Sequence, residues 1–313
     1  MMSDMVPGMI SVIIPSFNRK DMLLELLDSL TEQDYASYEI LIVDDGSSDG
    51  TEEALAGMNI RYLRNERNSG PGFSRKRGFR EARGEYAVFA DDDDYYTDPG
   101  FFSSAVGILE ADRGHTLSFA AANARIFYED NKSWGDVPLP MTGRIVAAEY
   151  LAGFSGKYPK PLSTFTAVFR RESLLSGGLD DITQVDDRII YLRALLAGDA
   201  FILSDCIGVY RVHRSNYSAT VSAEFTVTLH RENRAVYDEI QRRHILPSPD
   251  DWWYEQAWIA LRYYIQNPDS NLSGLWMIFR FLCRQRISLS RDLILFRQSL
   301  AYWHGRRKIA AAR

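Results

Sequence analysis

The sequence has little cysteine and no long apolar run, and each absence argues against a class of protein. Only Cys206 and Cys283 are cysteines among 313 residues, and no cysteine and histidine spacing is typical of a metal site. A disulfide framework and a zinc site are therefore not indicated, and a reducing cytoplasm suits the chain. No 18 consecutive residues are apolar, and the first residues lack a basic and a long apolar segment, so we expect no membrane-spanning helix and no signal peptide.

The net charge is negative over most of the chain and positive near residue 313. The formal net charge is -6, but the segment from Ser273 to Arg313 carries nine basic residues and one acid, a net of +8. The remaining residues therefore carry -14, which does not favour nucleic acid as a partner. This asymmetry predicts a site that handles cations or phosphates in one part and an anionic surface contact in the other.

The pattern of apolar residues predicts an α/β fold. Ile10–Ile14, Glu39–Val43 and residues 86–90 are short continuous apolar runs, typical of strands buried on both faces. Helical patterns and one further strand alternate with them: we expect helices over about 20–33, 50–57, 71–83 and 100–112, and a strand at 60–63. Such alternation predicts a mainly parallel sheet flanked by helices.

The second half of the sequence changes character near residue 220. Strand-like segments are expected at 117–128, 163–170 and 205–211. From about residue 223 the pattern is helical and rich in aromatic residues and arginine, with breaks at Pro247–Pro249 and Asn267–Pro268. We therefore expect an α/β domain over 1–220 and a helical extension over 221–313.

Polar and acidic clusters follow three of the predicted strands. They are Pro15–Asn18, Asp44–Asp49 and Asp91–Asp94. Ligands bind at the carboxyl ends of strands in open parallel sheets, so these clusters should converge. Two unit charges about 4 Å apart repel by roughly 4 kcal/mol at an effective dielectric near 20, so four consecutive aspartates require a counterion or full solvation. Converging carboxylates suit Mg²⁺ or Mn²⁺ together with a bound diphosphate.

Simpler interpretations exist for the same residues. Asp91–Asp94 is also compatible with a solvated turn before a helix, and Asp49 is predicted to cap a short helix. Helix capping is likewise an alternative for Asp186 and Asp187, and His213 is equally explained as a packed or surface histidine.

Four ordered motifs resemble those of a known family. They are Ile13–Arg19, Ile42–Thr51, Asn68–Arg75 and the segment from Gly84 to Asp94. Together they are similar to the motifs of the family 2 glycosyltransferases, which have the GT-A fold, and the resemblance covers roughly residues 9–220. It implies that residues 1–220 form a catalytic domain that binds a nucleotide sugar. The implied activity is metal-dependent, inverting transfer of a sugar from a nucleotide-diphosphate donor to a hydroxyl acceptor, with a UDP- or dTDP-sugar as donor.

The resemblance also implies which residues bind the donor: Pro15, Phe17, Asn18, Asp44, Asp45, Arg75, Asp91, Asp92 and Arg211. In the family the nucleotide base lies near the first motif and contacts an acid of the second, which leaves Asp44 and Asp45 as alternatives. Asp91 and Asp92 would face the ribose.

The chemistry is assigned by the same resemblance. Asp93 would bind Mn²⁺ or Mg²⁺ with His213, and Arg211 and His213 would stabilise the charge that grows on the leaving group. Asp187 maps to the general base that takes the acceptor proton on the face opposite the leaving group. It belongs to an Asp186-Asp187 pair where the family usually has Glu-Asp.

Several alternatives remain open for partners and function. Family acceptors are often saccharides or lipid-linked saccharides in cell-surface polysaccharide synthesis at the inner face of the plasma membrane, and the chain lacks the Gln-x-x-Arg-Trp motif of processive members. The basic and apolar segment near residues 275–297 is typical of a peripheral membrane contact, or of packing on the catalytic domain or another copy of the chain. Rival functions are a nucleotidyltransferase, which should carry a glycine-rich basic loop after the first strand, and a non-catalytic nucleotide-sugar or glycan-binding module.

Overall fold

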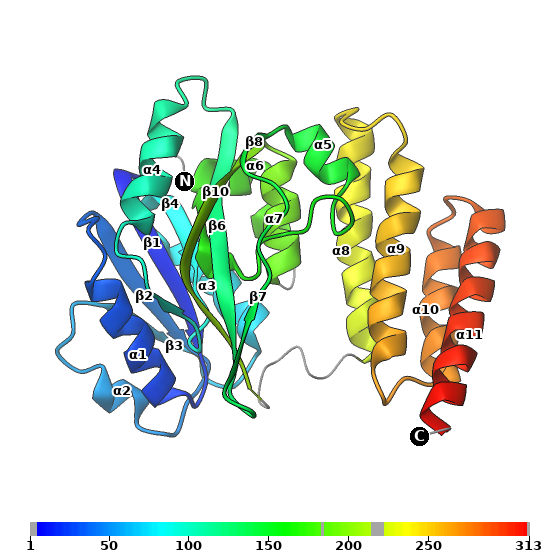
Figure 1. Cartoon of the computed structure of the whole chain (residues 1–313), viewed down its shortest axis with the longest axis horizontal. Helices are drawn as coiled ribbons and strands as arrows, with labels where there is room; N and C mark the ends of the chain where they lie inside the picture. Colours follow the sequence, from blue (N-terminus) through cyan, green and yellow to red (C-terminus); the bar gives the residue numbers. More distant parts are fainter. Residues whose placement is uncertain (1–4, 183–184, 214–221, 312–313) are drawn as a thin grey trace. The chain divides into compact units, whose positions relative to one another are not determined.

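The computed structural model describes residues 5–182, 185–213 and 222–311. The chain divides into two compact units, Met1–His213 and Arg214–Arg313, whose elements are drawn in Figure 1. The boundary predicted between residues 220 and 221, and Arg214 of the segment Tyr210–Arg214, lie outside the described residues.

A mixed sheet forms the centre of the first unit. Within the described residues it has ten strands, eight of them in the order β3-β2-β1-β4-β9-β6-β10-β5, with β7 beside β6 and β8 beside β10. β1 pairs in parallel with β2 and β4, and β2 with β3, whereas β9 is antiparallel to β4 and β6. The strands are β1 (Val6–Ser16), β2 (Tyr38–Asp44), β3 (Arg61–Arg64), β4 (Gly84–Phe89), β5 (Tyr95–Tyr96), β6 (Leu117–Tyr128), β7 (Ser133–Asp136), β8 (Gly143–Ile145), β9 (Ala167–Arg170) and β10 (Asp199–Val212). The predicted α/β architecture is confirmed.

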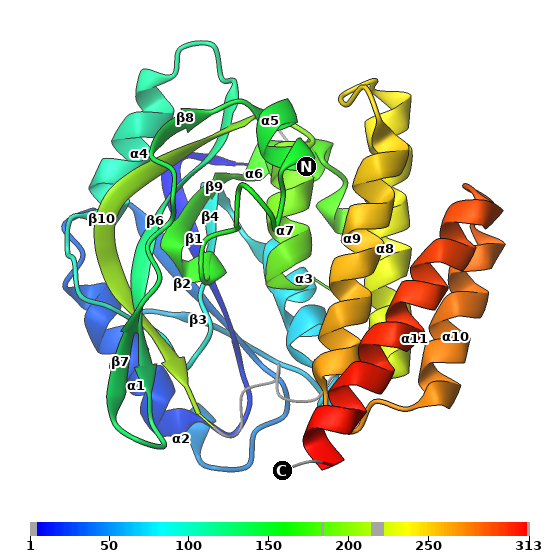
Figure 2. The same ribbon diagram turned by 45° about the vertical axis from the view of Figure 1, so that its right-hand side comes forward.

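Helices cover both faces of this sheet, as Figure 2 shows. Alternate residues of a strand point to opposite faces, so Val12 packs in the cluster that holds α1 and α4, while its neighbour Ile13 faces α3. α6 and α7 lie on the α3 side, where the Tyr191 ring of α7 packs on Phe119 and Phe169. The helices of this unit are α1 (Lys20–Thr31), α2 (Thr51–Ala54), α3 (Pro71–Glu81), α4 (Phe101–Ala111), α5 (Ala147–Ala152), α6 (Arg171–Ser176) and α7 (Asp187–Leu195), with 3-10 turns at Thr164–Thr166 and Leu179–Asp181.

Four helices make up the described part of the second unit: α8 (Ala223–Arg242), α9 (Pro249–Gln266), α10 (Leu272–Arg284) and α11 (Leu289–Ala311). The predicted breaks at Pro247–Pro249 and Asn267–Pro268 separate α8 from α9 and α9 from α10. α10 begins where the Asn271 side chain accepts a hydrogen bond from the Gly274 backbone N–H at 2.9 Å, a typical N-cap. No helix among the described residues combines the length and the apolar character that crossing a membrane requires.

Candidate functional site

The carboxyl ends of β1, β2 and β4 meet at one edge of the sheet and position the acidic clusters. β1 ends at Ser16, β2 at Asp44 and β4 at Phe89, directly before the acidic run. β10 runs parallel to β6, and β6 and β4 are both antiparallel to β9, so β10 and β4 run in the same direction. His213, which follows the end of β10, therefore lies at the same edge. The sheet therefore brings together side chains that lie more than 100 residues apart in the sequence.

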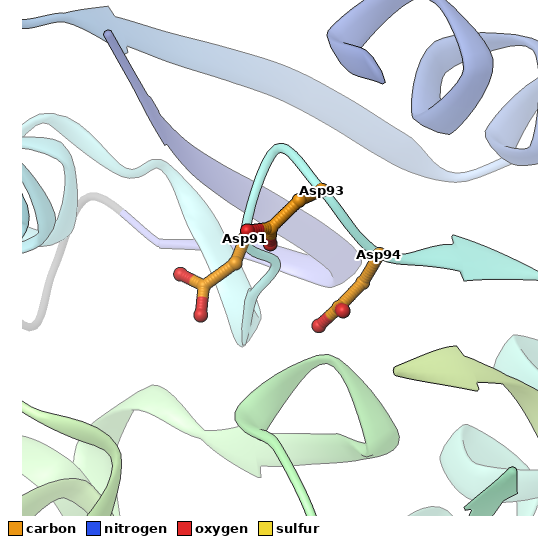
Figure 3. Close-up of side chains that lie close together, drawn as sticks. All are labelled: Asp91, Asp93 and Asp94. Carbon is orange, nitrogen blue, oxygen red and sulfur yellow. The ribbon is translucent and has the colours of Figure 1, made fainter. Parts of the chain in front are cut away.

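Three carboxylates of the acidic run converge in the turn after β4. Asp91, Asp93 and Asp94 each offer one oxygen atom, and these atoms all lie within 4.8 Å of one another (Figure 3). The His213 Nε2 atom lies 2.9 Å from Asp93 Oδ2. Carboxylate oxygens are the protein ligands that Mg²⁺ and Mn²⁺ prefer, so the three aspartates suit the cation that the sequence predicts.

Asp94 is a member of this cluster that the sequence did not single out. Its carboxylate is buried and accepts hydrogen bonds from the Ser163 hydroxyl at 3.1 Å and from the Arg211 backbone N–H at 3.2 Å. The only sequence signal for it is its place as the fourth aspartate of the run. Its contacts with Ser163 and Arg211 come from segments that are remote in sequence, so they could not be read from the chain.

The acidic run is crowded enough to change its own protonation. Burial raises the pKa of Asp91 to about 7, with further increases from Asp187 and Asp93 that Arg75 partly offsets. Burial and the neighbouring Asp93 also raise the pKa of Asp92 to about 6. The pKa of Asp94 is raised well above its usual value for the same reasons, burial first. The site thus holds more negative charge than its environment favours, as a site built to receive a cation would.

Arg19 supplies part of the missing positive charge. Its Nη1 atom lies 2.9 Å from Asp92 Oδ1 and 2.7 Å from Asp93 Oδ2. Burial opposes its charge, but Asp92 and Asp93 outweigh this effect and raise the pKa of Arg19. Sequence reasoning had assigned no role to Arg19, although it ends the first family-like motif. Asp93 Oδ2 thus contacts both Arg19 and His213, so a cation bound there would share this oxygen with them.

Arg75 joins the acidic cluster to the predicted base. Its buried guanidinium donates a short hydrogen bond to Asp91, and its Nη2 atom lies 3.2 Å from Asp187 Oδ1. Burial opposes the charge of Arg75, but Asp91 and Asp187 raise its pKa above the ordinary value. One buried cation thus holds two carboxylates, one from the turn after β4 and one from the first residue of α7.

The beginning of α7 separates the roles of its two aspartates. Asp186 is the N-cap, with its Oδ1 atom accepting a hydrogen bond from the Ile189 backbone N–H at 2.8 Å. The capping interpretation therefore holds for Asp186. Asp187 instead turns to Arg75, and the Lys160 Nζ atom lies 3.9 Å from its Oδ2 atom.

The acids after β2 stabilise the loops around them. The Asp44 carboxylate accepts hydrogen bonds from the Ser47 backbone N–H at 2.8 Å and from the Tyr62 hydroxyl. Asp45 accepts from the Asn65 side chain and from the Gly70 backbone N–H, both at 2.7 Å. Both carboxylates thus already have protein donors, and the choice between them as a contact to a nucleotide base stays a prediction.

The N-cap residue of α2 is Gly50, without a side-chain hydrogen bond, so the predicted N-cap position of Asp49 is wrong. Asp49 instead stabilises the loop before α2 by accepting hydrogen bonds from two backbone N–H groups. Its Oδ1 atom accepts from the Thr51 backbone N–H at 3.2 Å, and its Oδ2 atom accepts from the Lys20 backbone N–H at 3.0 Å. One side chain thereby ties together the beginnings of α1 and α2. Asn18 completes the loop with a left-handed backbone, φ 51°, and accepts from the Ser48 N–H at 2.8 Å.

Three further predicted donor contacts lie at the same edge. Pro15 pairs with Val43 near the end of β1, and Phe17 is an exposed apolar residue in the loop that follows. The Arg211 guanidinium contacts acids outside the aspartate run: it lies 2.7 Å from a Glu25 oxygen and 3.7 Å from a Glu129 oxygen. Its backbone N–H donates to Asp94 in the acidic cluster.

The comparison with protein families decides the assignment. The model of Glycosyl transferase family 2 matches residues 11–174, just over half of the chain. This chain belongs to glycosyl transferase family 2. The family resemblance predicted from the four motifs is therefore confirmed, and the chain is a glycosyltransferase.

Individual family members and solved structures agree with this assignment. A GalNAc(5)-diNAcBac-PP-undecaprenol beta-1,3-glucosyltransferase of Campylobacter jejuni is 27% identical over 223 residues, which cover 68% of each chain. The structure of S. aureus TarS 1-349 in complex with UDP-GlcNAc is similar with a TM-score of 0.63 and 19% identity, over 95% of this chain and 91% of that one. The mannosyltransferase PcManGT from Pyrobaculum calidifontis, in complex with GDP-Man and Mn²⁺, gives a TM-score of 0.52 and 20% identity, over 94% and 84%. At these identities the two structures establish the GT-A fold of this glycosyltransferase.

Proposed function

We propose that this family 2 glycosyltransferase transfers a sugar from a nucleoside-diphosphate donor to a hydroxyl acceptor with inversion at the anomeric carbon. The observation that carries the proposal is the link through Arg75, which contacts Asp91 in the acidic cluster and Asp187 at the start of α7. A donor diphosphate held at the cluster would therefore lie close to the carboxylate that removes the acceptor proton. The similar structures with UDP-GlcNAc and with GDP-Man and Mn²⁺ support a nucleotide sugar and a divalent cation.

The acidic cluster would hold the cation. Asp91, Asp93 and Asp94 would contribute carboxylate oxygens, and His213 lies beside Asp93 to contribute or orient a ligand. A bound Mg²⁺ or Mn²⁺ would neutralise the negative charge that develops on the leaving diphosphate. Exposed Phe17 offers a ring for the nucleotide base, and Asn18, Asp44 and Asp45 shape the loops next to it.

Asp187 would act as the general base. Direct displacement requires a carboxylate on the face of the sugar opposite the leaving group, where it accepts the proton of the attacking hydroxyl. Arg75 and Lys160 lie 3.2 Å and 3.9 Å from the two oxygens of Asp187, so they orient it. The proton moves to a carboxylate oxygen, and the oxygen of the acceptor replaces the diphosphate oxygen at the anomeric carbon.

The acceptor we propose is a saccharide or a lipid-linked saccharide in the synthesis of a cell-surface polysaccharide at the cytoplasmic face of the membrane. The support is the C. jejuni relative, whose name describes transfer to a saccharide on undecaprenol diphosphate. The donor sugar would be carried on UDP or dTDP, as the family motifs imply.

The decisive experiment compares Asp187→Asn with Asp180→Asn. Both changes remove one negative charge without changing the size of the side chain, and Asp180 contacts Arg80 away from the cluster. We expect D187N to lower kcat about 10²- to 10⁴-fold, because that is the usual contribution of general base catalysis, while the affinity for UDP with Mn²⁺ changes little. D180N should keep its activity. Equal activity of D187N and D180N would disprove the role of Asp187.

The cation is tested separately by Asp93→Asn. We expect Mn²⁺ to increase the affinity of the wild type for a nucleoside diphosphate, as measured by calorimetry, and EDTA to remove the increase. The D93N variant should show no response to Mn²⁺. A protein that binds the nucleotide and cation but never turns over a donor, with or without a saccharide acceptor, would instead be a binding module.

A further inference from the structure

The second unit carries a groove whose lining includes none of the proposed donor and cation contacts. It lies between α8 and α10, has a volume of about 500 Å³, and is lined by Val227, Arg231, Ser273, Trp276, Met277, Arg280, Phe281 and Arg284. On α10 the lining residues recur three or four positions apart, which places Ser273, Met277, Arg280 and Arg284 along one stripe of the helix. The groove is therefore a continuous feature of one helix face opposite α8.

The charge of this groove is all of one sign. Arg231, Arg280 and Arg284 are exposed, and none of the lining residues is acidic. Among the described residues these three arginines form no ion pair, in contrast to Arg234, which lies 2.9 Å from Asp238, and Arg291, which lies 2.9 Å from Asp251. Three unpaired guanidinium groups around one groove favour an anionic ligand with several oxygens, such as phosphate groups.

Apolar side chains accompany the arginines on the solvent side. Trp276 is 51% exposed although its ring packs on Phe296 of α11, with 5.8 Å between the ring centroids. Where the side chains of α10 and α11 are described, up to residue 306, the other exposed large apolar residues are Leu272, Met277, Leu289, Leu293 and Ile294. Exposed tryptophan and aliphatic side chains beside arginines are the composition of helices that lie in the headgroup region of a bilayer.

We propose that the groove and the neighbouring apolar edge of α10 and α11 bind the surface of a bilayer that contains anionic phospholipids. Arg231, Arg280 and Arg284 contact the headgroup phosphates, and Trp276 and Met277 enter the boundary between headgroups and acyl chains. A twofold contact with a second copy would place the same patch on both subunits and set arginine against arginine, so the charge favours lipid over self-association. This inference goes beyond sugar transfer and depends only on residues of the second unit.

Vesicle binding tests the proposal. The full-length protein is sedimented with vesicles of phosphatidylcholine and with vesicles that also contain phosphatidylglycerol. We expect binding only to the second kind, weaker at high salt. Each arginine near such a surface adds about a fivefold factor to binding, so Arg280→Gln with Arg284→Gln should reduce the partition coefficient about 25-fold. Met277→Gln should weaken binding without changing its salt dependence, because it removes apolar contact and no charge.

The matched control is the double variant Arg83→Gln with Arg113→Gln. Both residues are exposed and precede β4 and β6 at their amino ends, at the edge of the sheet opposite the acidic site. It should bind vesicles like the wild type, and circular dichroism melting should confirm that each variant is folded.

Four outcomes would overturn the proposal. The first is that the wild type does not bind anionic vesicles, and the second is that both double variants lose vesicle binding equally. The third is self-association that R280Q/R284Q abolishes and that vesicles do not change. The fourth is binding of inorganic phosphate without binding of vesicles.

Discussion

Arg75 is the residue whose loss should disturb the site most. It is buried, and it contacts Asp91 and Asp187, whose side chains remain 23% exposed. Removing one partner of a buried ion pair leaves the other charge uncompensated. We predict that Arg75→Met lowers the free energy of unfolding by about 3 kcal/mol. This is near the low end of the range for removing one partner of a buried ion pair, because both carboxylates keep some contact with water.

Urea denaturation of R75M beside Arg83→Met measures this effect. Arg83 is exposed, so R83M should change the free energy of unfolding by less than about 0.5 kcal/mol. Arg75→Lys keeps the charge but lacks the second nitrogen, Nη1, that donates a hydrogen bond to the Val185 carbonyl at 3.3 Å, so it should recover only part of the loss. Equal stability of R75M and R83M would show that the two contacts of Arg75 contribute nothing net.

At the same scale, residues that come directly after a strand could be predicted from the sequence. Residues whose role depends on distant contacts could not. Asp93 and His213 lie together as the implied cation ligands, because both follow strands that end at the same edge. Arg19 and Asp94 were missed because their importance depends on partners 70 or more residues away, such as Asp93 for Arg19 and Arg211 for Asp94. No local pattern encodes such pairs.

At the scale of the elements, two glycines within helices provide a matched test of packing. A Cβ atom at Gly78 of α3 would lie 2.4 Å from Ile13 Cγ2 and 3.2 Å from Val43 Cγ2, whereas a Cβ atom at Gly107 of α4 would have no neighbour within 4 Å. We predict that Gly78→Ala destabilises the protein by about 1–3 kcal/mol through overpacking. Gly107→Ala should stabilise it by up to about 1 kcal/mol, because alanine favours a helix over glycine.

Both changes are measured by chemical denaturation. The two variants carry the same substitution in helices that cover opposite faces of the sheet, so a difference between them isolates the close approach of α3 to β1 and β2. If Gly78→Ala also stabilises the protein, the approach of α3 is looser than the structure has it.

The contact between α9 and α11 predicts a pH dependence. Asp292 is buried, its Oδ1 atom accepts a hydrogen bond from the Tyr254 hydroxyl at 2.7 Å, and its Oδ2 atom has no partner among the described residues. Burial raises the pKa of Asp292 despite this hydrogen bond. The pKa of Asp292 is thus higher in the folded than in the unfolded protein. The stability that this shift contributes is fully present at a pH below the unfolded pKa, and it is lost as the pH rises through the folded pKa.

Asp292→Asn should therefore gain stability relative to the wild type at pH 7 and gain less at pH 4, because the raised pKa leaves more of the wild-type carboxyl protonated at the lower pH. Urea denaturation at both values measures the difference. The control is Asp269→Asn at an exposed position, which should change the free energy of unfolding by less than about 0.5 kcal/mol. A gain of D292N that is the same at both pH values would mean that burial does not perturb this carboxyl.

The elements themselves follow from local physics to different degrees. Glu39–Val43 was predicted as a buried strand because its apolar residues Ile40 to Val43 suit a position between two parallel neighbours, and β2 includes all of it. α2 has only four residues where a helix over 50–57 was expected, since Gly57 adopts a left-handed backbone, φ 83°. β10 begins at Asp199 rather than near 205, because Ala200, Phe201 and Ile202 already pair with β6. The register of the pairing shifts between Ile202 and Cys206, where the strand carries exposed residues.

At the scale of the whole molecule, the change of composition near residue 220 anticipated that the chain has two parts, but not what the second part does. The amphipathic pattern of residues 275–297 fits lipid, a second copy and the catalytic domain equally well as a sequence. The structure adds which side chains are buried: Leu275, Ile278 and Leu282 pack inward, whereas Trp276, Arg280 and Arg284 face solvent. That distinction depends on three-dimensional packing, which helical periodicity alone does not determine.

The last prediction concerns how the two units respond to a ligand. All proposed donor and cation contacts belong to Met1–His213, and none to α8–α11. A ligand that binds only the native state at 100 times its Kd adds about 2.7 kcal/mol of stability to the part that must stay folded to bind it. We therefore expect UDP with Mn²⁺ to slow amide hydrogen exchange in the segments around Asn18, Gly70 and Asp91–Asp94, while exchange in α8–α11 stays unchanged. Asp93→Asn, with the same ligands, should abolish the effect, and equal slowing in both units would show that they unfold as one cooperative body.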